Sequence, residues 1–309
     1  MAHFLNKDIS AHGFRDVVQS VIHEVIYEQV QFGLDEITDG LISWQDPISH
    51  FCAKMAGFKI TGLRRYFDTN FYYRLPQITS KPKRREPLLL DEFLYAQGVA
   101  GKPLRVVLTG PVTLATHSEG LIKPYDKFSA RFDFFKEILA DEISTLSSKG
   151  ASLIQIDEPA LLQHPEYFEP LKKALDTFSQ KAKPSRLILA VFFSSAFPLI
   201  DKLLTLPVDS LNLDLTIDGK KTFDKLLESK TKLAIGFGLF SSRNTRMEAM
   251  DPIINQMTQW IEKSEAESCY LTPSSGLEFL PREHVGAKLK LLGRIKQEIQ
   301  KNLPQSVSL

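Results

Sequence analysis

Short apolar segments alternate along the chain with longer segments that are apolar on one face only. The short segments are dense in Val, Ile, Leu or Phe without strict polar alternation, which is typical of strands buried in a parallel sheet. They are residues 33–38, 103–108, 152–156, 186–193, 210–215, 232–237 and 269–272. The longer segments have helical periodicity and are residues 126–148, 166–180, 220–229, 249–263 and 282–301. Repeated strand–helix units predict parallel strands joined by crossover helices.

This pattern predicts the α/β class and, within it, a single-domain (β/α)8 barrel of the TIM type. Seven strands are visible, and an eighth at the N-terminus would close the barrel. Residues 3–6 are its natural place, so we expect a first strand that is short or irregular. The alternative is a doubly wound open sheet, which the lack of a GxGxxG motif after an early strand disfavours. We expect one domain over residues 1–309, with a helical lead-in at 1–30 and a flexible tail at 302–309.

Residues 62–85 break this rhythm, because they are aromatic and then basic and do not fit a strand–helix unit. The segment ends in the basic run Lys-Pro-Lys-Arg-Arg at residues 81–85. We interpret this run as a solvated loop. The alternative is an electrostatic guide for the anionic tail of a substrate.

The charge balance and the cysteines narrow the function classes. The chain has 309 residues with 38 Lys and Arg and 37 Asp and Glu, a net charge of +1, so nucleic acid and acidic membranes are not favoured as partners. Two cysteines make no disulfide framework and indicate a reducing compartment. No stretch reaches the roughly 18 apolar residues that a membrane span needs. We therefore expect a cytoplasmic protein.

Polar residues follow the predicted strands, where a barrel of this type builds its active site. Asp157 and Asp214 come directly after buried strands, and an unpaired buried carboxylate is costly. Each either caps a helix or pairs with a neighbour such as Arg243, or acts on a ligand. The convergence of several such residues on one mouth favours the ligand. In Asp157-Glu158, successive side chains diverge, so one faces the mouth while the other supports a neighbouring strand or loop.

Several motifs resemble those of the cobalamin-independent methionine synthases. They are IQIDEPAL at residues 154–161, LTGPVTL at 108–114, RYFDTNFYYRLPQ at 65–77 and the late pair Arg243-Asn244. The Asp-Thr-Asn motif followed by aromatic residues, together with the Arg-Asn pair, is most similar to the N-terminal of the two homologous barrels in that family. The resemblance implies methyl transfer from 5-methyltetrahydrofolate to the sulfur of homocysteine, in methionine biosynthesis.

The family's zinc ligands are missing from this chain. The resemblance implies a His-x-Cys pair, a Glu and a Cys that hold the zinc, which binds homocysteine as a thiolate. The corresponding positions carry Val191-Phe192-Phe193, Asp214 and Ser275. Valine and phenylalanine cannot bind a metal, and a neutral serine is a poor zinc ligand. We therefore expect no bound zinc or other cofactor here, with 5-methyltetrahydrofolate as a possible substrate.

Three hypotheses follow for the function. In the first, the chain binds folate, homocysteine or both, and works with a separate zinc-bearing catalytic barrel. The second is a zinc-free enzyme that uses the rim carboxylates for acid–base chemistry. The third is a non-catalytic binding or regulatory protein. The candidate catalytic residues are Asp157, Glu158 and Asp214, and the candidate substrate-binding residues are Asp68, Thr69, Asn70, Tyr72, Gly110, Thr113, Arg243, Asn244, Ser274 and Ser275.

Overall fold

Six parallel strands form the main sheet, in the order β3-β5-β6-β7-β8-β9. The computed structural model describes residues 10–266 and 268–302. The strands are β3 (Arg105–Thr109), β5 (Leu153–Asp157), β6 (Arg186–Val191), β7 (Ser210–Asp214), β8 (Ala234–Phe240) and β9 (Cys269–Pro273). All six are predicted from the sequence, with ends that differ by up to three residues. Their residues are mostly buried, as expected of strands packed on both faces.

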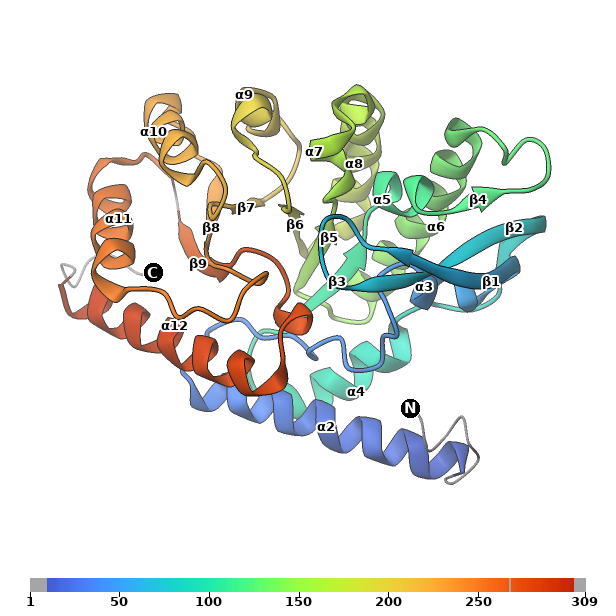
Figure 1. Ribbon diagram of the computed structural model, residues 1–309, viewed down its shortest axis with the longest axis horizontal. Coiled ribbons are helices and arrows are strands. Elements are labelled where there is room, and N and C mark those ends of the chain that lie inside the picture. Colours follow the sequence, from blue (N-terminus) through green and yellow to red (C-terminus); the bar gives the residue numbers. More distant parts are fainter. Residues whose placement is uncertain (1–9, 267, 303–309) are drawn as a thin grey trace.

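Helices connect these strands and pack around the sheet (Figure 1). The longer ones are α2 (Ala11–Gln31), α4 (Leu90–Ala100), α6 (Phe128–Ser148), α8 (Phe168–Ala182), α10 (Gly219–Ser229), α11 (Met250–Lys263) and α12 (Arg282–Asn302). The shorter ones are α3 (Ser49–Ala53), α5 (Pro111–Thr116), α7 (Ala160–Gln163) and α9 (Ile200–Leu203). In α6, Phe132, Phe135 and Leu139 form the buried face that the helical periodicity predicts. Within the described residues, no helix is long and apolar enough to cross a membrane.

The segment predicted as a strand at residues 33–38 contributes only one bridge, between Ile37 and Leu104 of the loop before β3. The predicted strand is therefore wrong in extent. Its charged residues form ion pairs with neighbouring elements: Asp35 with Lys296 of α12, and Glu36 with Arg105 of β3. In the described part of the chain, no strand lies between this segment and β9. The first strand predicted at residues 3–6 lies outside the described residues.

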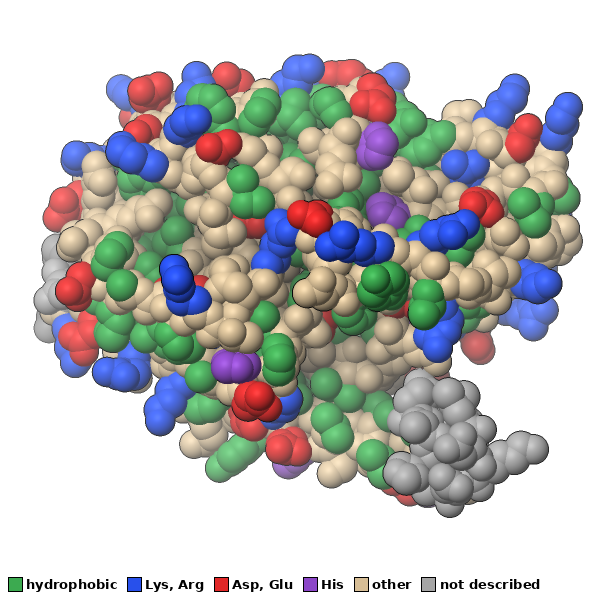
Figure 2. All heavy atoms as spheres, in the orientation of Figure 1, with side chains coloured by type: hydrophobic (Ala, Val, Ile, Leu, Met, Phe, Trp, Pro, Cys, Tyr) green, Lys and Arg blue, Asp and Glu red, His purple; other side chains and the backbone are tan. Residues whose placement is uncertain are grey.

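An antiparallel hairpin accounts for the segment that breaks the strand–helix rhythm. It consists of β1 (Met55–Arg65) and β2 (Tyr72–Arg84), and the short strand β4 (Glu119–Gly120) pairs with β2. Residues 81–84 are therefore the end of a strand and not a solvated loop, because Arg84 forms an ion pair with the fully buried Glu142. Lys and Arg side chains gather along the hairpin (Figure 2).

The tip of the hairpin reaches the carboxyl ends of the barrel strands. The ring of Phe67 lies 5.6 Å from that of Phe193, which follows β6, and the ring of Tyr66 stacks on that of Phe279 at 6.2 Å. Phe193 and Phe279 also contact each other, with ring centroids 5.4 Å apart. These aromatic contacts hold the hairpin beside the mouth of the barrel.

Candidate functional site

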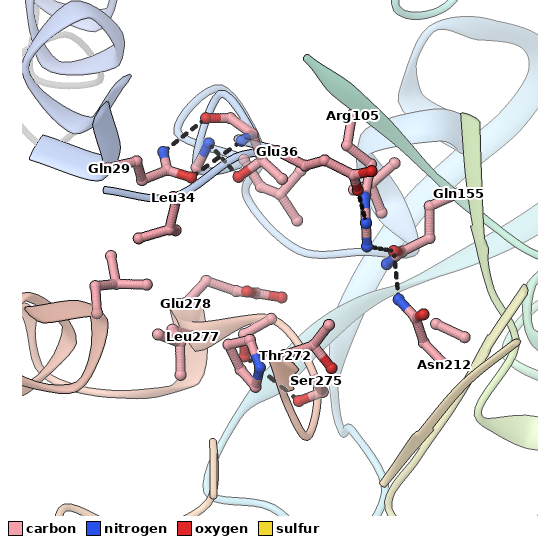
Figure 3. Close-up of a pocket in the computed structure, with 18 of the residues that line it drawn as sticks. Gln29, Leu34, Glu36, Arg105, Gln155, Asn212, Thr272, Ser275, Leu277 and Glu278 are labelled. Atoms are coloured by element: carbon pink, nitrogen blue, oxygen red, sulfur yellow. Dashed lines mark hydrogen bonds and ion pairs between the residues drawn. The ribbon is translucent and has the colours of Figure 1, made fainter. Parts of the chain in front are cut away.

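A cavity of about 870 Å³ lies inside the barrel and reaches the carboxyl ends of its strands at Asp157 and Ser274. Its polar wall comes from strands β3, β5 and β7, and its opposite wall comes from residues 274–278 after β9 (Figure 3). Residues of α2 and α12 line its side, in the gap between residue 37 and β9, among them the apolar Val25, Leu289 and Leu292. The cavity therefore combines apolar stretches of wall with polar and charged groups, which suits a small molecule that has both kinds of surface.

Asp157 and Glu278 are two of the acidic groups that line this cavity, and they face it from opposite walls. Asp157 is the last residue of β5, and its Oδ1 accepts a hydrogen bond of 2.6 Å from Gln155 Nε2. Burial raises the pKa of Asp157 to about 7, although Arg105 acts against the shift. Glu278 has exposed surface, but that surface faces the cavity, where solvation is poor. Burial, with repulsion from Asp157 and Asp39, raises the pKa of Glu278 to about 7. At neutral pH both carboxyl groups can therefore gain or lose a proton.

Glu158 points away from the cavity and supports the turn after β3. Its carboxylate accepts hydrogen bonds from Val112 N at 3.0 Å, from Thr113 N at 2.6 Å and from the Thr113 hydroxyl. There is room for it because Gly110 has no Cβ, which would lie 2.1 Å from Glu158 Oε2. These bonds satisfy the first free backbone N–H groups of α5. Glu158, Thr113 and Gly110 therefore have a structural role, which is to stabilise the start of this helix. The divergence of Asp157 and Glu158 is as predicted.

Asp214 is also turned into the protein. Its side chain accepts hydrogen bonds from the backbone N–H and the hydroxyl of Thr216, at 2.9 and 2.6 Å, and from Phe193 N at 3.3 Å. Burial raises its pKa. Asp214 is 1% exposed and does not line the cavity, so its contacts fit a structural cap better than catalysis.

The predicted ligand-binding residues of the hairpin lie beside the mouth, outside the cavity. Asp68 is 81% exposed and forms an ion pair with Arg243, whose Nη2 also donates to Asp68 O at 2.5 Å. The buried Thr69 accepts from Phe71 N and stabilises the turn, whereas Asn70 and Tyr72 are exposed. Asp68 ties the hairpin to the loop after β8, and none of these four hairpin residues lines the cavity.

The serines after β9 do line the cavity. Ser274 and Ser275 both hydrogen-bond to Ser242, with the two hydroxyl oxygens 3.0 and 2.5 Å from that of Ser242. Asn244 lies further out, where it donates to the Ser241 hydroxyl and accepts from Arg246 N. Of the predicted binding residues, the structure therefore brings Ser274 and Ser275 together with Asp157.

The sequence interpretation missed many polar residues of the cavity wall, among them Glu36, Arg105, Gln155 and Asn212. A usable signal exists for Gln155, because it interrupts an apolar strand two positions before Asp157, and residues two apart in a strand face the same side. Arg105 and Asn212 likewise interrupt apolar strands. Glu278 was missed as well, and nothing in the apolar periodicity points to it.

The donor set in the cavity does not fit a zinc ion. The resemblance places the family's ligands at Val191, Phe193, Asp214 and Ser275. Val and Phe side chains cannot bind a metal, and Asp214 and Ser275 already hydrogen-bond to other residues. Cys269 lines the cavity at the first residue of β9, and burial raises the pKa of its thiol to about 11, which disfavours the thiolate. Across residues 10–266 and 268–302, no three His, Cys, Asp or Glu side chains are grouped so that they could hold a metal.

Comparisons with known proteins assign the chain to one family. The family model described as "Cobalamin-independent synthase, Catalytic domain" matches residues 1–297. A methionine synthase of Sulfurisphaera tokodaii is 31% identical over 295 residues, 93% of this chain and 83% of the relative. One from Thermococcus kodakarensis is 31% identical over 279 residues, 89% of this chain and 81% of the relative. These relatives are therefore also about the size of one barrel.

A solved structure has the same fold. A B12-independent methionine synthase from Shewanella sp. W3-18-1, in complex with selenomethionine, superposes with a TM-score of 0.79 over 96% of this chain and 92% of that one. Its sequence identity is 14%, so the likeness concerns the fold alone. The predicted barrel class is confirmed. The matching family model describes a catalytic domain, and no comparison places the chain with the N-terminal of the family's two barrels.

Proposed function

The chain belongs to the cobalamin-independent methionine synthase family, and from this premise we propose that its cavity binds a methionine-like amino acid during S-methyl transfer. The substrates are homocysteine and a methyl donor of the 5-methyltetrahydrofolate type, and the product is methionine. The chain acts as one barrel of a two-component system, in which a separate zinc-bearing barrel activates the thiol.

The observation that carries this proposal is the position of Asp157 in the cavity. An amino acid brings an ammonium group, and a carboxylate at the end of a buried strand is a fitting partner for it. Glu278 adds a second negative charge from the opposite wall, and the hydroxyl of Ser275 lies on the same side as Glu278. The apolar walls suit a thioether side chain. The complex of the Shewanella relative with selenomethionine supports this ligand class.

The separate zinc-bearing barrel is proposed because the cavity lacks soft donors. Zinc held by such a partner barrel would supply the activation of the thiol that this cavity has no donors for. The residues of this chain hold the amino acid by its charged end and exclude water with the apolar walls. Arg243, beside the mouth and 28% exposed, is placed to meet an anionic group of a methyl donor if Asp68 releases it.

Metal analysis and reconstitution test the two-component proposal. We expect the purified chain to contain no stoichiometric zinc and to form no methionine from homocysteine and 5-methyltetrahydrofolate. Addition of a zinc-bearing barrel of the same family from the same genome is expected to start methionine formation, faster than that barrel alone. Stoichiometric zinc together with activity of the isolated chain would show that the proposal is wrong.

The affinity for L-methionine is expected to fall as the pH is lowered. Asp157 must be ionised to pair with the ammonium, and its pKa is about 7 in the folded protein. The ligand ammonium stays charged in this range, so the dissociation constant rises about tenfold per pH unit below 7 and levels off above it. Isothermal titration calorimetry from pH 5 to 8.5 measures this profile. A flat profile would exclude Asp157 as the partner of the ammonium.

A second candidate function is zinc-free proton transfer, which the two carboxyl groups with pKa values near 7 favour. Asp157 and Glu278 would then act as base and acid on the bound amino acid. Exchange of the α-proton of methionine in deuterium oxide, followed by NMR, distinguishes the two candidates. Exchange that depends on Glu278 supports proton transfer, and its absence supports a binding role for both carboxylates.

A further inference from the structure

A network of hydrogen bonds runs along one wall of the cavity and ends at Asp157. Arg105, at the start of β3, forms an ion pair with Glu36 and donates from Nη1 to Gln155 Oε1 at 2.8 Å. Asn212 Nδ2, from β7, donates to the same oxygen at 3.3 Å. Gln155 Nε2 then donates to Asp157 Oδ1 at 2.6 Å. Figure 3 shows Arg105, Gln155 and Asn212 joined in this way on one wall of the cavity.

The orientation of the Gln155 amide follows from its partners. A guanidinium has only donors, so the amide oxygen of Gln155 must face Arg105. The amide nitrogen must then face Asp157, and it can only donate to that carboxylate. The Asn212 donor takes the remaining lone pair of the Gln155 oxygen. Rotation of the Gln155 amide by 180° would place its N–H groups against Arg105 and its oxygen against the Asp157 carboxylate. The hydrogen-bond network therefore has one stable arrangement.

Neighbouring elements hold the residues of this hydrogen-bond network in place. Asn212 packs against Gly236 of β8, where a Cβ would lie only 2.0 Å from Asn212 Oδ1. Arg105 is held by Glu36 from the segment before β3. Both Arg105 and Gln155 side chains therefore have fixed neighbours.

Other charged or titratable groups act on Asp157 without orienting it. Glu158 is next in the chain but bonds to Thr113, and Glu278 repels Asp157 from the opposite wall. Tyr66 of the hairpin is buried and interacts with the same charge. The hydrogen bond from the Gln155 amide favours the ionised form of Asp157, and the positive charge of Arg105 adds to this effect.

We propose that Arg105 and Gln155 are positioning residues, which hold Asp157 Oδ1 so that Oδ2 meets the ammonium of the ligand. This inference rests on the proposed function only for the nature of the ligand. Arg105 acts through Gln155, and neither residue needs to touch the amino acid. Orientation by a fixed donor lowers the cost of ordering the carboxylate when the ligand binds.

The titration of Asp157 tests this inference without any ligand. Protein labelled with ¹³C-carboxyl aspartate gives the Asp157 signal, assigned by its loss in Asp157→Asn. We expect Gln155→Glu to raise the midpoint by about one pH unit or more, because the new carboxylate cannot donate and repels Asp157. Gln97→Glu makes the same chemical change on α4, where the side chain only reaches Gly150 O, and should leave the midpoint unchanged.

A second measurement separates orientation from charge. Gln155→Met adds no charge but removes the donor, and we expect it to weaken L-methionine binding about tenfold at pH 8.5, where Asp157 is largely ionised in the wild-type protein and in this variant. Arg105→Lys should give a smaller loss, since lysine keeps the charge but not the fixed geometry. If Gln155→Glu does not fold, Gln155→Met is titrated in its place, and its midpoint should also rise.

The outcomes distinguish this inference from the proposed function. An unchanged Asp157 midpoint in the folded Gln155 variants would overturn the positioning role, even if methionine binds well. If the midpoint moves but the wild-type protein binds neither methionine nor homocysteine, the positioning role stands and the proposed ligand is wrong.

Discussion

Asp157→Asn is expected to weaken L-methionine binding roughly 30- to 150-fold at pH 8, a loss of about 2–3 kcal/mol. The carboxylate lies in a cavity with apolar walls, where an ion pair with an ammonium is stronger than in water. Asparagine has the same shape and still accepts the hydrogen bond from Gln155, so the loss reports the charge. Calorimetry at several pH values measures it, and the pH dependence assigned to Asp157 should disappear in the variant.

Asp214→Asn is the matched control for this substitution. Asp214 also ends a barrel strand and also has a raised pKa, but it bonds to Thr216 and Phe193 and does not line the cavity. We expect its replacement to change methionine affinity less than about threefold while lowering stability. Equal losses of affinity in both variants would contradict the assignment of Asp157 as the ligand partner.

Glu158→Ala is expected to lower the free energy of unfolding by about 3–4 kcal/mol with little change in affinity. The substitution leaves three buried donors without an acceptor, namely Val112 N, Thr113 N and the Thr113 hydroxyl. Each unsatisfied buried donor costs about 1 kcal/mol or more. It also empties the space beside Gly110 that the carboxylate fills. Urea denaturation measures the loss, provided that unfolding is reversible.

Glu137→Ala is the control for the stability measurement. Glu137 is exposed on α6, so its replacement should change the free energy of unfolding by less than about 0.5 kcal/mol. If Glu158→Ala instead keeps its stability and loses methionine affinity, Glu158 acts on the ligand, as predicted from the sequence, and is not a structural support. The two neighbouring carboxylates 157 and 158 are thus expected to separate into a ligand partner and a structural support.

The basic segment of the hairpin could not be predicted correctly from the local sequence pattern. The run at residues 81–85 looks like a solvated loop because five polar or proline residues follow one another. In the structure, Arg84 pairs with Glu142, a residue 58 positions away that is fully buried in α6. Such a partner cannot be found from local composition, because the contact depends on how α6 packs against the hairpin.

The sequence by itself determined the barrel class, six of its strands and the longer helices other than α4. Burial on both faces demands apolar strands, and one-sided burial demands helical periodicity, so both leave a direct trace in the order of residues. The motifs that carry the family resemblance are equally local. The divergence of Asp157 and Glu158 could be predicted for the same reason, since it follows from the alternation of side chains along a strand.

Only the tertiary structure decided which carboxylate faces the cavity. Glu158 turns to α5 because Gly110, 48 residues earlier, leaves room for it, and Asp157 is then left with Gln155 and the cavity. The opposite wall with Glu278, the reduction of residues 33–38 to one bridge and the path of the hairpin also depend on distant partners. The direction of a side chain at a strand end is set by the space and the hydrogen-bond donors of its neighbours, and those neighbours meet only when the chain is folded.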